Sequence, residues 1–287
     1  MPVDASRLEA QGLSRVGGRP PYFSYMREVF QRRDFIVSLA RYRIEAENQR
    51  NRLGVGWVLL KPILNALVFG LVFGILMKSH ADTPFFIEFL LIGVFLFEFF
   101  SGSLGAGSKS ITSNSALVQS LSFPRMSLPI SVVTQKFFQL VPTMALLIIA
   151  LVVMGHRPQL EWLLLIPLLA LFYVFCLGMV LIVARLTVHV RDLANLIPFL
   201  TRFVFYTTGI FFSFDVRFAD HPELLEIVQY QPVYAILSLG RSILLNSDPL
   251  YTMDPTLWWI TGAWSIGLLV IGSVFFWRAE ERYGRVF

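Results

Sequence analysis

The sequence predicts an all-α, polytopic integral membrane protein with six transmembrane helices. Of its 287 residues, 55% are hydrophobic and only 15% are charged, and the mean hydropathy is +0.64. Soluble domains carry about 25% charged residues, so this composition favours lipid as the surrounding medium. A helix crosses about 30 Å of hydrocarbon with roughly 20 apolar residues. Six segments meet or approach that length: 56–77, 85–106, 128–154, 162–184, 196–214 and 256–277.

The region before the first span divides into two parts. Residues 1–22 contain several glycines and prolines and few bulky apolar residues, which predicts a flexible cytoplasmic tail. Residues 23–54 predict two amphipathic helices, an aromatic one in the lipid headgroup layer and a second over 33–52 with an apolar stripe. Residues 55–287 then form the six-span transmembrane domain.

The basic residues predict that both termini are cytoplasmic. Lys and Arg gather in the loops on the cytoplasmic side of a membrane. Ten arginines precede residue 56, and with an even number of spans they share a side with Lys109, Arg125 and the basic C-terminal tail. We therefore attribute the net charge of +5 to membrane topology and not to nucleic-acid binding.

Residues 215–250, between spans five and six, combine acidic residues with two apolar pieces that are too short to cross a membrane. Such lengths predict re-entrant helices that form a structured outer vestibule. The alternative is a pair of amphipathic helices resting on the outer leaflet.

Several catalytic and cofactor classes do not fit the sequence. The glycine-rich segment 102–110 is similar to a phosphate loop, but Ser108 separates Gly107 from Lys109, where the Walker pattern requires lysine directly after glycine. We therefore expect no ATP hydrolysis by this chain itself. The four histidines are scattered over different loops, which argues against a metal site, and the single Cys176 excludes an intrachain disulfide.

Ionisable and aromatic residues within the spans are open to two interpretations. Glu98 falls near the middle of span two, where ionisable groups mark function, but a proton-coupled carrier would need several carboxylates at that depth. Glu98 therefore serves transport or pairs with a basic group inside the bundle. The aromatic side chains either pack the bundle or form a pore wall on which sugar rings stack and slide. Those in question are Phe69 and Phe73 in span one and Phe199, Phe203 and Tyr206 in span five.

The connection between spans two and three predicts a short cytoplasmic helix. Ser113 or Asn114 caps its start, and Pro124 ends it because the residue before a proline avoids the α region. A short amphipathic helix at the surface fits a groove on another protein, and an ordinary interfacial turn is the alternative. Its apolar face consists of Leu117, Val118 and Leu121.

A series of short motifs resembles the membrane subunit of type-2 ABC exporters of polysaccharides and teichoic acids. The motifs are Arg52-Leu-Gly-x-Gly-Trp57-x-Leu-Leu-x-Pro62, Leu91-x-Gly93 with Phe97 and Phe99-Phe100, Asn114-x-x-Leu117, Phe123-Pro124-Arg125-x-x-Leu128-Pro129 and Arg191-Asp192-Leu193. Each motif is modest alone, but their order and spacing fit the six-span topology from about residue 30 to the C-terminus.

The resemblance implies a permease without catalytic activity in the bacterial cytoplasmic membrane. It would form a homodimer and bind two copies of a separate ABC ATPase, which would hold ATP and Mg²⁺. The substrate would be an undecaprenyl-linked glycan moved to the outer face. The helix over 33–52 would gate the entrance, spans one and five would line the channel, and the region around 219–245 would form the outer gate. The coupling helix at about 115–123 would contribute Ser115, Leu117, Val118, Leu121, Phe123 and Arg125 to ATPase contact.

Arginines surround the expected entrance and could attract the pyrophosphate of a lipid-linked sugar, because guanidinium binds phosphate oxygens in a bidentate way. Ordinary positive-inside charge is the alternative for any one of them. Two other functions also stay open: a type-2 ABC permease for a small hydrophobic drug or lipid, and a secondary flippase without an ATPase. The arginines are Arg41, Arg43, Arg50 and Arg52.

Overall fold

The computed structural model of the chain describes residues 20–49, 52–72, 85–120, 123–214, 222–246 and 248–283. Within these ranges every regular element is helical, which confirms the all-α prediction. The predicted tail over 1–22 lies almost entirely outside the described residues, and so do the predicted site residues Arg50, Phe73 and Leu121.

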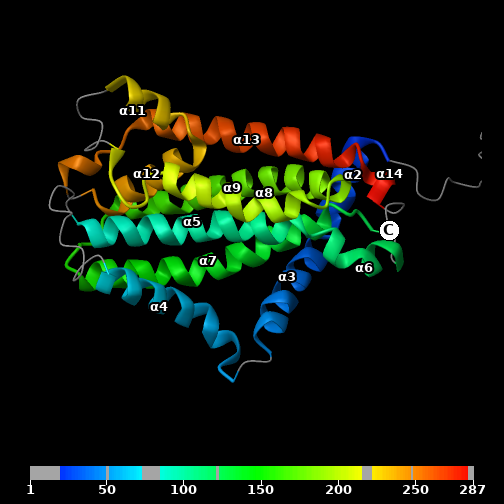
Figure 1. Cartoon of the computed structure of the whole chain (residues 1–287), viewed down its shortest axis with the longest axis horizontal. Coiled ribbons are helices and arrows are strands. Elements are labelled where there is room, and N and C mark those ends of the chain that lie inside the picture. Colours follow the sequence, from blue (N-terminus) through cyan, green and yellow to red (C-terminus); the bar gives the residue numbers. More distant parts are fainter. Residues whose placement is uncertain are drawn as a thin grey trace, which may run out of the picture.

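Among the described residues, five helical segments are long and apolar enough to cross a membrane, which confirms a multi-pass membrane protein. They contain α4 (Trp57–Leu71), α5 (Phe86–Ser108), α7 (Ser127–Val153), α8 (Leu165–His189) and α13 (Pro255–Trp277). Short 3₁₀ turns, η1 (Gly54–Gly56) and η4 (Leu160–Leu164), lead into α4 and α8. Helices α5, α7, α8 and α13 run along the long axis of the molecule (Figure 1).

The predicted fifth span over 196–214 is shorter in the structure. Helix α9 (Leu193–Thr207) has 15 residues and would extend about 22 Å, which is less than the hydrocarbon thickness. The chain then leaves the helical conformation, because Gly209 adopts a φ of 60° and the Thr208 hydroxyl bonds back to the Val204 carbonyl at 2.9 Å. The count of six spans is therefore not confirmed by helix length.

The tightest packing in the bundle joins α8 to α13. A Cβ atom on Gly178 would overlap the backbone of Leu268, and one on Gly272 would overlap the Gly178 carbonyl. Thr261 and Ser265 are also fully buried on α13. Small residues let membrane helices approach closely where apolar burial alone gives no driving force.

Helices α11 (Pro222–Gln229) and α12 (Pro232–Leu244), with the turn η5 (Pro249–Tyr251), form one end of the molecule (Figure 1). Both helices are too short to span a membrane. Eleven of the 13 residues of α12 are buried, and the helix packs against α5, α8 and α13. This region was predicted to be re-entrant; the structure shows an inserted short helix without placing it relative to a membrane.

The opposite end carries α6 (Ser115–Ser120), which follows the turn η3 (Thr112–Asn114), and α14 (Glu280–Tyr283). Helix α2 (Tyr22–Gln31) is amphipathic as predicted: Tyr25 and Val29 are buried, whereas Phe23 and Phe30 are exposed. Helix α3 (Arg33–Asn48) packs against α7 and contacts η1 at the start of α4, and the two helices form a V beside the bundle (Figure 1).

Candidate coupling and entrance sites

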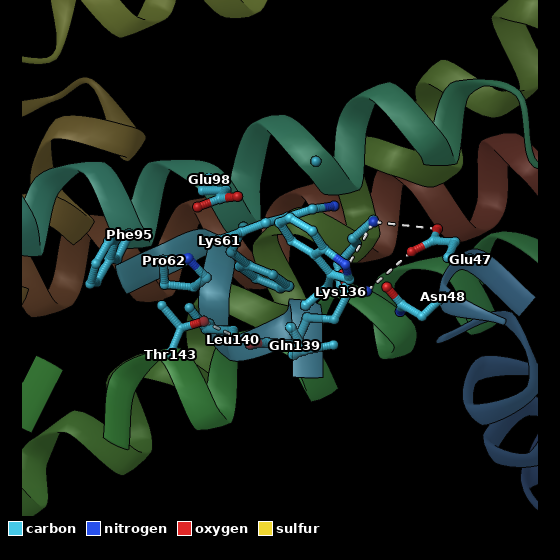
Figure 2. A pocket seen from close by; sticks show the side chains of 14 residues that line it. Glu47, Asn48, Lys61, Pro62, Phe95, Glu98, Lys136, Gln139, Leu140 and Thr143 are labelled. Carbon is cyan, nitrogen blue, oxygen red and sulfur yellow. Dashed lines mark hydrogen bonds and ion pairs between the residues drawn. The ribbon is translucent and has the colours of Figure 1, made fainter. Parts of the chain in front are cut away.

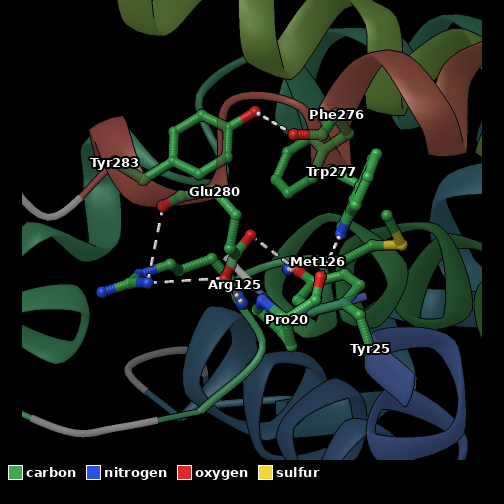
Figure 3. Close-up of polar contacts among 8 residues, drawn as sticks. All are labelled: Pro20, Tyr25, Arg125, Met126, Phe276, Trp277, Glu280 and Tyr283. Atoms are coloured by element: carbon green, nitrogen blue, oxygen red, sulfur yellow. Dashed lines mark hydrogen bonds and ion pairs between the residues drawn. The ribbon is translucent and has the colours of Figure 1, made fainter. Parts of the chain in front are cut away.

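A buried polar cluster joins three distant chain segments at the α6 end of the bundle; we call it the Glu280 cluster (Tyr25, Arg125, Glu280 and Tyr283). The Tyr25 hydroxyl donates to Glu280 Oε2 at 2.7 Å, and the backbone N–H of Arg125 donates to Glu280 Oε1 at 3.0 Å. The N–H of Met126 donates to the Tyr25 hydroxyl oxygen at 3.1 Å. Figure 3 shows Glu280 between α2, the segment before α7 and the C-terminal helix.

Further bonds fix the same three segments. The Arg125 guanidinium pairs with Glu280 at 3.5 Å, and the Tyr283 hydroxyl donates to the Phe276 carbonyl at 3.1 Å. Trp277 Nε1 donates to the Pro20 carbonyl at 3.0 Å. The start of α2, the segment between α6 and α7, and the C-terminal helices are thus bonded to one another within one buried cluster (Figure 3).

Burial raises the pKa of Glu280, although hydrogen bonds and charge from Arg125 and the Tyr25 hydroxyl act in the opposite direction. Burial also raises the pKa of Tyr25 well above its ordinary value, and the Glu280 charge adds to that effect. Tyr25 therefore keeps its proton at physiological pH and stays a donor to the carboxylate. A buried cluster of this kind stabilises one arrangement of its segments, because each group left unbonded would cost about 1–3 kcal/mol.

Helix α6 is the predicted coupling helix. In the structure, some of its residues pack against the rest of the chain and others are exposed. Val118 is 2% exposed and belongs to a core cluster with Tyr25, Ile111 and Tyr283, so its side chain packs inside this chain. Leu117 is half-buried, as is Ser115. The exposed residues of α6 are Ala116, Gln119 and Ser120.

The two predicted coupling residues that follow α6 lie close to other elements. The Phe123 ring contacts the ring of Phe35 on α3, with centroids 5.6 Å apart, and Arg125 belongs to the Glu280 cluster. The structure therefore links the segment after α6 directly to α2, α3 and α14.

Glu47, in the last turn of α3, attaches that helix to α7. Gln135 Nε2 donates to Glu47 Oε1 at 2.7 Å, Gln139 Nε2 donates to Oε2 at 3.2 Å, and Lys136 Nζ lies 3.7 Å from Oε1. Gln135 is 2% exposed, so this contact is shielded from solvent on the α7 side. The predicted gate helix is thereby held to the bundle near its C-terminal end by charge-assisted hydrogen bonds.

A cavity of about 160 Å³ lies beside this attachment, between the end of α3, the start of α4 and the facing sides of α5 and α7; we call it the entrance pocket. Figure 2 shows Glu47 and Asn48 at one end of it and Phe95, Pro62 and Thr143 at the other. Lys61, Glu98 and Lys136 all line this pocket, and both lysine charges act on Glu98. The sequence left open whether Glu98 serves transport or pairs with a basic group inside the bundle, and the structure places two lysines from other spans in the same pocket.

The predicted entrance arginines do not converge on one point. Arg41 and Arg52 are exposed, whereas Arg43 is half-buried and its Nη2 atom is buried without a hydrogen-bond partner among the described residues. Burial lowers the pKa of Arg43, and the nearby Glu47 charge acts in the opposite direction.

The predicted channel aromatics differ in exposure. Phe199, Phe203 and Tyr206 on α9 are 60–67% exposed, so they form an apolar face that no other element of the described chain covers. Phe69 on α4 is half-buried and packs against the main core.

A buried arginine on α12 bonds to the backbone just after the end of α9. Arg241 on α12 is 3% exposed; its Nε donates to the Phe89 carbonyl at 3.3 Å and its Nη2 to the Gly209 carbonyl at 3.0 Å. Its guanidinium also lies 3.4 Å from the centre of the Phe89 ring. Nearby, His156 lies 3.5 Å from Glu88, and in the described part of the chain no three His, Cys, Asp or Glu side chains gather as a metal site would require.

The sequence analysis did not identify Glu47, Tyr25, Glu280 or the role of Arg241. Glu47 and Glu280 stand in charged segments where a carboxylate looks like ordinary surface, and their partners are 88 to 255 positions away along the chain. Arg241 offered a signal, because it is the one basic residue within the apolar stretch 232–245. A charged group in such a stretch usually has a partner inside the protein.

These features define the chain as a polytopic helical membrane protein with a surface helix at one end and a polar pocket between its spans. A family model described as ABC-2 type transporter matches residues 36–245. The chain belongs to the ABC-2 type transporter family, which confirms the resemblance inferred from the motifs.

Curated relatives match over most of their length. The chain is 26% identical over 255 residues to an O-antigen export system permease protein RfbA of Klebsiella pneumoniae. The alignment covers 88% of this chain and 95% of that protein. It is 28% identical over 264 residues to the O-antigen export system permease protein RfbA of Myxococcus xanthus, covering 89% of this chain and 96% of that protein.

Proposed function

We propose that this chain is the transmembrane subunit of an ATP-driven ABC exporter that moves a polysaccharide across the bacterial cytoplasmic membrane. The observation that carries the proposal is the family match together with relatives described as O-antigen export permeases, each aligned over about 95% of its length. A coupling role for α6 gains support from its position, because the segment that follows it is bonded into the Glu280 cluster.

The proposed topology has both termini and α6 in the cytoplasm, with α11 and α12 as re-entrant helices at the outer face. In this topology α9 and the residues after it complete the sixth span. The buried Arg241 supports that arrangement, because it bonds to the Gly209 carbonyl where α9 ends, and non-helical backbone at membrane depth needs such internal partners.

The proposed assembly is a homodimer of this chain with two copies of a separate ABC ATPase, which would bind ATP and Mg²⁺. Helix α3 would gate the cytoplasmic entrance, since Glu47 holds its end to α7 through bonds that a movement could break. The exposed aromatic face of α9 would line the channel. The transported molecule would be an undecaprenyl-linked glycan, whose pyrophosphate Arg41, Arg43, Arg50 and Arg52 would attract at the entrance.

A permease for a small hydrophobic drug or lipid and an ATPase-independent flippase are the two alternatives. Depletion of the chain in its host separates the first from the proposal: lipid-linked glycan should accumulate on the cytoplasmic leaflet while surface polysaccharide falls. Unchanged surface polysaccharide would refute glycan export.

Co-expression with the ATPase subunit separates the second alternative. We expect the solubilised chain to co-purify with the ATPase, and glycan export to stop when the ATPase cannot hydrolyse ATP. Export that continues with an inactive ATPase would refute the ATP-driven mechanism.

A further inference from the structure

The entrance pocket has the size of a site for one small ring. Its volume is about 160 Å³. For comparison, a cavity of about 150 Å³ in another protein holds a benzene molecule. The pocket is therefore too small for a drug-sized molecule, which needs roughly 300 Å³ or more, but large enough for a single six-membered ring.

The charged side chains that line the entrance pocket are two lysines and two glutamates, so their formal charges cancel. Lys61 and Lys136 are matched by Glu47 and Glu98, with Lys136 3.7 Å from Glu47. Two carboxylates would repel a phosphate, and two lysines would repel a cation. The pocket therefore favours a ligand that is polar but carries no net charge.

The polar groups supply both donors and acceptors. The Gln139 side chain donates to Glu47 and accepts from Lys136, both at 3.2 Å. The Thr143 hydroxyl donates to the main-chain carbonyl of Gln139 at 2.9 Å, and its oxygen can still accept a hydrogen bond. A hydroxyl group of a ligand could therefore donate to a carboxylate, and a neighbouring hydroxyl group could accept from a lysine.

Aromatic rings complete the lining. Trp57 at the start of α4 is half-buried, so its ring can contact a ligand, whereas Phe95 and Phe99 on α5 are each 3% exposed and pack behind the pocket surface. An aromatic face beside paired hydrogen-bonding groups suits a sugar, because a pyranose ring has apolar C–H faces and a rim of hydroxyls.

We propose that the entrance pocket binds one uncharged sugar residue of the transported glycan, with Trp57 against the ring and Glu98, Lys61 and Gln139 bonded to its hydroxyls. This proposal rests on the proposed function and names the place where the glycan is held beside the gate helix. Because Glu47 both lines the pocket and attaches α3 to α7, the position of α3 controls access to the sugar.

The single cysteine of the chain makes the test specific. Cys176 is fully buried, so a thiol introduced into the full-length protein in membrane vesicles is the reactive one. Val58→Cys places it in the pocket, and Gly102→Cys offers a second pocket position where the nearest atoms belong to the flexible Lys136 side chain, 3.6 Å away. Glu45→Cys is the control, since Glu45 lies on α3 one turn or less from the pocket residues Glu47 and Asn48, is exposed and does not line the pocket.

Labelling by a small methanethiosulfonate reagent is measured with and without glycan released from its lipid carrier. At a glycan concentration of about ten times Kd, labelling of the pocket thiols should slow roughly tenfold, because protection follows 1 + [L]/Kd. Labelling of Glu45→Cys should be unaffected by the glycan. Inorganic pyrophosphate is the second probe and should not protect.

Three results would overturn the sugar site: absence of glycan protection at both pocket positions, equal protection at Glu45→Cys, or protection by pyrophosphate instead. Pocket thiols that do not react at all would also overturn it, because the pocket would then be closed to solutes. The depletion experiment is read separately: if export depends on the chain but the pocket thiols are not protected, the sugar site fails and the exporter assignment stands.

Discussion

At the scale of single residues, the contact with the buried Arg241 explains why position 93 is a glycine. A Cβ on Gly93 would lie 2.6 Å from Arg241 Nη2, so the absence of a side chain makes room for the guanidinium. The Leu91-x-Gly93 motif was recognised from the sequence as a family resemblance, but its physical reason lies in a residue 148 positions further along the chain. No local pattern contains that information.

Gly93→Ala should therefore destabilise the protein by about 1–3 kcal/mol, because the added methyl overpacks a buried site and displaces a bonded guanidinium. The measurement is the free energy of unfolding in detergent, followed by tryptophan fluorescence. Gly262→Ala on α13 is the control, since nothing lies within 4 Å of its Cβ position. Equal stability of both variants would contradict the role assigned to Gly93.

Glu280 gives the stability a specific pH dependence. Burial raises its pKa in the folded state, so the folded protein binds the proton more tightly than the unfolded chain. That contribution is fully present below the ordinary pKa of about 4.3 and is lost as the pH rises through the folded pKa. The free energy of unfolding should thus fall with rising pH in that window, by at most about 1.4 kcal/mol per unit for this group.

Glu280→Gln removes this titration, so the stability of wild type minus that of the variant should decrease from about pH 4 upward. Unfolding midpoints of both proteins across the pH range give the difference, which cancels other titrating groups. A difference that stays constant or grows with pH would show that the Glu280 pKa is not raised.

At the scale of elements, helix α6 shows what periodicity predicts and where it stops. The sequence predicted a short surface helix with Leu117 and Val118 on one face, and α6 is found over Ser115–Ser120. The sequence did not reveal that Val118 packs into the core of its own chain, because an apolar face looks the same whether it meets a partner or the same molecule.

Two substitutions in α6 should therefore have different effects. Leu117→Asp, at a half-buried position, should weaken ATPase association while the thermal unfolding midpoint of the isolated chain stays close to wild type. Val118→Asp places a charge in the core and should lower that midpoint itself. Gln119→Asp is exposed and serves as the control for added charge. Wild-type ATPase binding by a stable Leu117→Asp protein would refute the coupling assignment.

Helix α9 marks the limit of prediction from hydropathy. The apolar stretch continues to Phe214, so composition alone extends the helix, but Gly209 with its positive φ and the back-bonded threonines end it at Thr207. Hydropathy measures preference for lipid and not backbone conformation. The five other spans, where no such break intervenes, were predicted to within a few residues at the ends that the structure describes.

At the scale of the whole molecule, two helices lack sufficient partners. Only Pro62 is buried on α4, and the exposed residues of α9 include five large apolar or aromatic side chains: Leu196, Phe199, Leu200, Phe203 and Tyr206. The entrance pocket beside α4 holds Lys61 and Glu98, both exposed in the single chain. Charged groups exposed to hydrocarbon are costly, so we expect this side of the bundle to face a water-filled passage that is closed off from lipid by a second protein surface.

A second copy of the chain meets that requirement, because a twofold arrangement would place α4 and α9 of one copy against the same helices of the other. Native mass spectrometry in a mild detergent should detect a species of twice 32.7 kDa. Leu200→Ala combined with Leu67→Ala should shift it toward monomer, since both side chains are more than 50% exposed and would be buried in the dimer. Val270→Ala with Ile271→Ala removes comparable exposed apolar surface from α13 and should leave the dimer intact. The opposite result, dissociation by the α13 pair and not by the α4–α9 pair, would place the dimer interface on α13. A protein other than a second copy would then have to separate the entrance pocket from lipid.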